Sequence, residues 1–194
     1  MSNVSRKENT QKMVLGAILT ALVVVLQLMG SFIKLGPFSV SLVLVPIVIG
    51  AAMCGAGIGA WLGFVFGVAV LLSGDAAAFL SINVLGTIVT VLLKGTLCGL
   101  LAGVTYKLLE KRNRYIAVIS AAVVCPLVNT GVFLLGCAVF FLKTITEWGA
   151  QAGFSNAVGY MFLGLAGGNF LFELLTNIVL APVILRVISL TKKD

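Results

Sequence analysis

Three polar residues interrupt an apolar run near the end of the chain. In the stretch GGNFLFELLTNIVLAP, residues 167–182, Asn169, Glu173 and Asn177 lie at steps of four. Residues at i and i+4 share one face of a helix, so these side chains form a polar stripe about two turns long. A carboxylate with two carboxamides on one face could bind a polar ligand.

A second polar face lies in the run NVLGTIVTVLLKG, residues 83–95. Thr87, Thr90 and Lys94 fall there at i, i+3 and i+7. The rise per residue places Lys94 roughly 17 Å along its helix and Glu173 roughly 15 Å along its own. The two ionisable groups therefore lie at matching depths, where charge is expensive and is expected to face a cavity or a counter-charge.

The motif CPLVNTG, residues 125–131, adds polar groups at the same depth. Pro126 removes a backbone donor and loosens the helix locally, and Asn129 lies roughly 20 Å from the far end of its helix. Three helices thus bring polar groups to one level, which predicts a pocket that opens outward. The predicted substrate-binding residues are Lys94, Asn129, Thr130, Asn169, Glu173 and Asn177.

The same groups have a purely structural interpretation. Asparagine, threonine and a buried Lys94–Glu173 pair could hold helices together, at about 0.6–2 kcal/mol per interhelical hydrogen bond. A proton relay would be a narrower version of the functional reading, although one lysine and one glutamate make a short relay. We prefer the pocket because the polar groups are many and are confined to three helices.

Composition indicates that these helices lie in a membrane. Of 194 residues, 60% are hydrophobic and only 10% are charged, with a mean hydropathy of +1.18. These values are far outside those of soluble globular domains and are typical of an integral membrane protein. The net charge of +7 could suggest nucleic acid as a partner, but the positions of the charges explain it without one.

Cutting the chain at charges and turn residues predicts an all-α fold, a bundle of six transmembrane helices. Each crossing needs about 20 mainly apolar residues. The predicted spans are 13–33, two within 35–74 that are separated at CGAGIG (54–59), 83–106, 115–142 and 163–188. We expect one transmembrane domain over 13–190, a tail at 1–12 and a short tail at 191–194.

The basic residues predict the orientation of this bundle. Lys34 and Lys143 lie on one side and Lys94 lies within the membrane, which leaves ten of the 13 basic residues on the other side. These ten are Arg6, Lys7, Lys12, Lys107, Lys111, Arg112, Arg114, Arg186, Lys192 and Lys193. Because positively charged loops stay in the cytoplasm, we expect both termini to be cytoplasmic in a multi-pass cell-membrane protein, such as one of a bacterial plasma membrane.

Other chemistry finds little support in the sequence. The four cysteines show no paired spacing and the chain has no histidine, so we expect no metal site and no cofactor. The Ser-His proteases and histidine-ligated metalloproteases are excluded for the same reason. No GxxxxGK[ST] motif occurs, so any ATP would be hydrolysed by another protein.

Small residues recur at steps of four. Glycines at 55, 59, 63 and 67, and again at 95, 99 and 103, predict faces on which helix backbones approach closely. Ala17 and Ala21 have the same spacing. The outer segment 143–162 is long enough to cover a cavity, although its Trp148 also suits the headgroup region of a membrane.

The order of these elements resembles the substrate-binding S components of energy-coupling factor (ECF) vitamin transporters. The resemblance spans nearly the whole chain. It rests on the AxxxA element of Ala17 and Ala21, the block LVLVPIVIGAAMCGAGIGAWLGFVFG after the first outer loop, CPLVNTG, and FELLTNIVLAPVI in the last helix.

The resemblance implies a role in uptake and a set of partners. Such S components bind a vitamin or vitamin precursor in an outward pocket, perform no chemistry, and associate with a membrane coupling subunit and two ATPase subunits. Ala17 and Ala21 would contact the coupling subunit, and the pocket would reach the cytoplasm when the S component tips in the bilayer. Substrate would be held by the polar residues of the last three helices and by the outer loops.

The residue types alone do not decide between this function and two alternatives, and they do not identify the vitamin. A small membrane-embedded enzyme would need a nucleophile or metal set, and a self-sufficient channel would need a ring of like groups. In the pocket, Lys94 suits a carboxylate or phosphate, Glu173 suits an amine or hydroxyl, and outer aromatic residues could stack on a ring. Pantothenate, folate, riboflavin and pyridoxine-like ligands each meet part of this description.

Overall fold

The chain folds into an elongated bundle of helices. The computed structural model describes residues 3–31, 34–35, 38–39 and 42–191. Five helical stretches in this part of the chain are long and apolar enough to cross a membrane. They are α1 (Asn3–Gly30), α3 (Ala56–Ser73), α5 (Val84–Leu109), α6 (Arg114–Phe140), and the continuous stretch of α8 (Ala157–Gly159), the π-helix η1 (Tyr160–Gly167) and α9 (Gly168–Thr191).

The predicted second span is only partly helical. A short antiparallel hairpin pairs β1 (Lys34–Leu35) with β2 (Phe38–Ser39), and α2 (Leu44–Cys54) begins after it. The 11 residues of α2 extend about 16 Å, which is too short to cross a membrane core of roughly 30 Å. The count of six membrane-crossing helices therefore stays a prediction.

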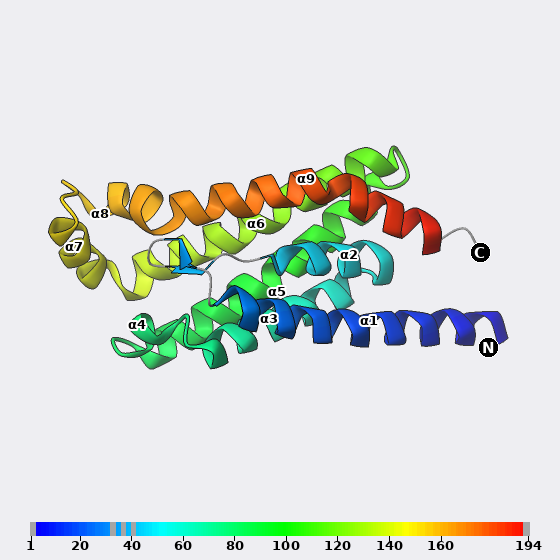
Figure 1. The fold of residues 1–194 in the computed structure, drawn as a ribbon, viewed down its shortest axis with the longest axis horizontal. Coiled ribbons are helices and arrows are strands. Elements are labelled where there is room, and N and C mark those ends of the chain that lie inside the picture. The colour runs from blue at the N-terminus through cyan, green and yellow to red at the C-terminus, as the bar shows by residue number, and fades with distance from the viewer. Residues whose placement is uncertain (1–2, 32–33, 36–37, 40–41, 192–194) are drawn as a thin grey trace.

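Helix α2 packs in the interior of the bundle. It lies between α9 on one side and α1 and α3 on the other (Figure 1), and Leu44, Ile47 and Val48 are fully buried. The predicted break within 54–59 is confirmed. The chain turns there at Gly55, whose φ of 98° lies in a region that favours glycine.

The predicted glycine faces of α3 and α5 are confirmed as a packing seam, except at Gly55, where an added Cβ would meet nothing within 4 Å. The two helices run antiparallel, and Gly59 faces Gly99 while Gly63 faces Gly95. A Cβ added at Gly59 would lie 2.5 Å from the carbonyl oxygen of Gly99. Only glycine therefore allows the two backbones to come this close.

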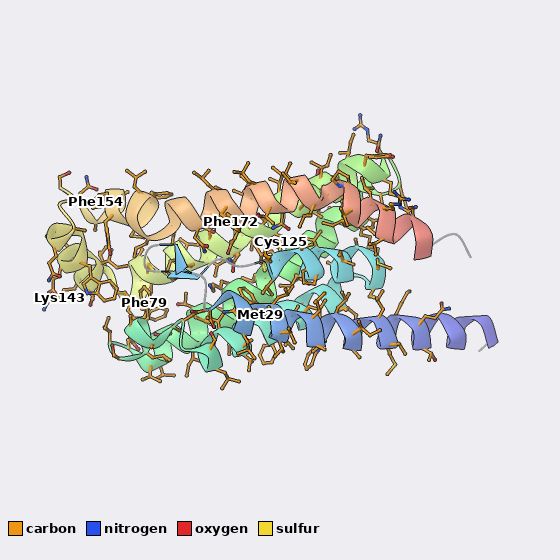
Figure 2. All side chains as sticks on the ribbon, viewed as in Figure 1. Met29, Phe79, Cys125, Lys143, Phe154 and Phe172 are labelled. Carbon is orange, nitrogen blue, oxygen red and sulfur yellow. The ribbon has the colours of Figure 1, made fainter. Side chains whose placement is uncertain are left out.

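The two ends of the bundle differ. Helix α1 begins and α9 ends at one end, whereas α4 (Ala77–Leu80), α7 (Leu142–Gln151) and α8 lie at the other (Figure 1). The predicted outer segment 143–162 is thus largely helical. Phe79, Lys143 and Phe154 mark this end in Figure 2, and we call it the α7 end.

Candidate functional site

A large cavity lies between the helices. It holds about 600 Å³ of space free of protein atoms, part of which opens to the outside. Helices α1, α3, α5 and α6 line it, together with α4 and the first turn of α9. Its lining residues are Gln27, Val70, Asp75, Ala76, Phe79, Thr87, Thr90, Val91, Lys94, Phe133, Cys137, Phe141 and Asn169.

A smaller cavity of about 330 Å³ adjoins the large one. Its lining residues are Lys94, Asn129, Thr130, Phe133, Leu165, Ala166 and Asn169. Lys94, Phe133 and Asn169 line both cavities. The structure therefore brings together four of the six predicted site residues, and they come from the three helices that the sequence indicated.

Lys94 is held by aromatic rings. Its Nζ lies 5.6 Å from the centroid of the Phe66 ring and 5.4 Å from that of the Phe133 ring, which is within the range of a cation–π interaction. Within the described part of the chain, Lys94 forms no direct ion pair with Glu173. The direct Lys94–Glu173 pair considered from the sequence is therefore not formed.

Glu173 lies behind the cavities and connects two helices. Its side chain is only 1% exposed and lines neither cavity. Asn129 Nδ2 donates to Glu173 Oε2 at 3.3 Å, and Asn169 Nδ2 donates to Oε1 at 3.2 Å. Glu173 thus makes an interhelical hydrogen bond of the kind that the structural interpretation expected, because its carboxylate joins α6 to α9 through the Asn129 amide.

Asn177 is also outside the two cavities. It is buried, and its Nδ2 donates to the backbone oxygen of Glu173 at 2.8 Å, one turn earlier in α9. Its Oδ1 is buried without a hydrogen-bond partner. Of the polar stripe of α9, only Asn169 therefore lines the cavities, whereas Glu173 and Asn177 do not.

Sequence reasoning missed several residues of the large cavity. Gln27 Nε2 donates to Asp75 Oδ2 at 2.6 Å and so connects α1 to the turn after α3. Gln27 is a polar residue within an apolar span, as Asn129 is, so the same sequence argument could have identified it as a candidate site residue. The Phe79 ring packs edge-to-face against those of Phe133, Phe141 and Trp148, and no pattern distinguishes these phenylalanines from ordinary core residues.

Ala17 and Ala21 line neither cavity and lie on the exposed face of α1. The opposite face of the helix is buried through Leu19 and Val23. The exposed face also carries large apolar side chains, namely Met13, Val14, Ile18, Leu22, Val25, Leu28 and Met29. A surface of this kind suits lipid or another apolar helix and not water.

Comparison with known proteins gives one match. A family model described as "ECF transporter, substrate-specific component" matches residues 11–188, which is most of the chain. No curated protein matches, and no solved structure matches.

Proposed function

The chain belongs to the substrate-specific components of ECF transporters, and from this premise we propose that it is the high-affinity subunit that binds a vitamin or vitamin precursor for import. It is a multi-pass membrane protein and a part of a transporter. A membrane coupling subunit and two ATPase subunits would complete the transporter and supply ATP hydrolysis. The observation that carries the proposal is the pair of adjoining cavities at the level of Lys94.

The large cavity has the character of a small-molecule site, and the small cavity that adjoins it is lined mostly by polar residues. Such sites are mostly apolar and contain a few polar groups that fix the orientation of the ligand. Here, Phe79, Phe133 and Phe141 supply apolar walls, while Lys94 and Asn169 supply polar groups in both cavities. Asn129 and Thr130 would complete the binding site in the small cavity, with Glu173 supporting it from behind.

The charges support an orientation in which the α7 end faces outward. The opposite end holds the start of α1, the α5–α6 junction and the end of α9 (Figure 1). These segments carry the described basic residues Lys12, Lys107, Arg114 and Arg186. Lys143 lies at the α7 end (Figure 2). By the positive-inside rule, both termini would be in the cytoplasm of a bacterial cell and the substrate would enter near α4 and α7.

The exposed face of α1 is the proposed contact with the coupling subunit. Ala17 and Ala21 are separated by one turn and leave a shallow strip between larger apolar side chains. Small residues at this spacing let another helix approach closely in lipid. The strip lies away from the cavities, so docking and substrate binding would use different surfaces of the protein.

The proposal is tested with the purified protein in detergent. Native mass spectrometry should detect a vitamin or precursor that stays bound through purification, and calorimetry should give a nanomolar dissociation constant for it. Failure of every vitamin to bind would contradict the proposal. Turnover of the bound compound would indicate an enzyme instead, and ion current in planar bilayers would indicate a channel.

A further inference from the structure

The carboxylate of Glu173 fixes the orientation of two amides. An ionised carboxylate only accepts hydrogen bonds, whereas a carboxamide has a donor end and an acceptor end. Asn129 and Asn169 both donate through Nδ2 to Glu173. Their carbonyl oxygens therefore lie at the end of each amide that is turned away from Glu173.

These two carbonyl oxygens lack partners within the protein. Oδ1 of Asn129 and Oδ1 of Asn169 are both buried and accept no hydrogen bond. Both residues line the small cavity, and Asn129 is only 4% exposed. An unsatisfied buried acceptor costs about 1–3 kcal/mol. A ligand in the cavity would therefore gain the most binding free energy if it presented hydroxyl or amide N–H donors to these oxygens. Asn177 Oδ1 is also unpartnered, but it lines neither cavity.

The charged group at the junction of the cavities is a cation. Lys94 lines both, its ammonium lies near the Phe66 and Phe133 rings, and the Glu173 and Asp75 carboxylates act on it electrostatically without a direct ion pair to Glu173. The carboxylate of Asp75, which lines only the large cavity, already accepts a hydrogen bond from Gln27. An anionic group beside Lys94 would gain a charge-assisted hydrogen bond away from bulk water, where such bonds are strongest.

We propose that the substrate is a compound with one or more anionic groups and with hydroxyl or N–H donors. The anionic group binds Lys94, and the donors bind the carbonyl oxygens of Asn129 and Asn169. Glu173 is a positioning residue that holds both amides in this orientation and does not touch the substrate. This inference rests on the proposed function and narrows its substrate class.

A panel of vitamins that differ in charge tests the substrate class. Pantothenate, biotin and folate carry a carboxylate and donors, riboflavin and pyridoxine are neutral, and thiamine is a cation. We expect the tightest binding by calorimetry in the first group. Tightest binding of riboflavin, pyridoxine or thiamine would overturn the substrate class and leave the proposed function intact. Absence of binding by all six would overturn both.

A matched ligand pair tests the role of Lys94. The carboxylate of the tightest binder is converted to its uncharged methyl ester. The wild-type protein should bind the ester at least tenfold more weakly than the acid, whereas Lys94→Met should bind the two within about threefold of each other. Lys94→Arg keeps the charge and should keep the preference for the acid. An unchanged preference in Lys94→Met would overturn the assignment.

A second pair tests Glu173 as a positioning residue. A glutamine at this position offers one acceptor and one donor, so one of the two amides should turn and present its NH2 group to the cavity. Glu173→Gln should therefore weaken binding about tenfold, and methylating a donor of the ligand should cost less in this variant than in the wild type. If Glu173 had only a structural role, methylation of the ligand would weaken binding to Glu173→Gln and to the wild type by the same factor. Equal factors would overturn the positioning role.

Discussion

The close contact of α3 with α5 gives a prediction whose size follows from the structure. A Cβ added at Gly63 would overlap the carbonyl oxygen of Gly95 and lie 2.6 Å from its carbonyl carbon. Carbon atoms pack best at about 3.5–4.0 Å, so the helices would have to separate by about 1 Å. Overpacking of this kind costs about 1–3 kcal/mol. The obstacle is backbone on both sides, so no rotamer change can relieve it.

The higher helix propensity of alanine offsets part of this overpacking cost. Alanine is favoured over glycine in a helix by about 1 kcal/mol, so we expect Gly63→Ala to lose about 0–2 kcal/mol in net stability. Gly57, in the same helix, is the matched control, because an added Cβ there would meet nothing within 4 Å. Gly57→Ala should therefore gain helix propensity without any steric overlap with α5.

The assay is thermal unfolding of both variants in the same detergent. For a chain of this size, 1 kcal/mol corresponds to about 2–4 °C in the melting temperature. Gly63→Ala should therefore melt several degrees below Gly57→Ala, which should melt at or above the wild type. If Gly63→Ala melts as high as Gly57→Ala, the backbones of α3 and α5 are not in contact and the seam is refuted.

Three further predictions concern other surfaces. Replacing Ala17 and Ala21 together by leucine should leave vitamin binding in detergent unchanged. The same variant should not support uptake in cells that supply the coupling subunit and the ATPases. Normal uptake would contradict the proposed docking surface. Asn129→Ala should weaken vitamin retention at least tenfold by calorimetry while gel filtration shows an intact protein, and normal retention would mean that the pocket is misplaced. Gln27→Leu removes a buried donor to Asp75 and should lower stability by about 1–3 kcal/mol, seen as a lower melting temperature; an unchanged melting temperature would show that this hydrogen bond contributes little.

The apolar pattern predicted where helices lie better than how long they are. It located the long helices and the break at Gly55, because charges and glycines mark those boundaries. It did not predict that the helix in the second span, α2, has only 11 residues, because a continuous apolar run reports burial and does not fix helix length. Leu44 and Ile47 in α2 are fully buried.

The depth argument predicted the meeting of polar groups but not their roles. Counting residues along each helix placed Lys94, Asn129 and Glu173 at one level, and hydrogen bonds and cavity walls now join their helices. Which of these residues faces the cavity depends on rotation about the helix axis and on side-chain torsions. Both depend on packing partners, such as the Phe66 and Phe133 rings around Lys94, that lie far apart in the sequence.

The separation of Lys94 from Glu173 has a consequence for binding. A direct ion pair would neutralise both groups and leave little charge for a ligand, and a substrate would have to break the pair before it could bind. Here, both oxygens of Glu173 accept hydrogen bonds from amides, while the Lys94 ammonium lies near ring faces that attract a cation more weakly than a carboxylate does. An anionic ligand can therefore approach Lys94 without displacing Glu173. The glycine seam contributes to this arrangement, because Gly95 follows Lys94 and Gly63 precedes Phe66 by less than one turn, so the close backbone contact brings the Phe66 ring within reach of the ammonium.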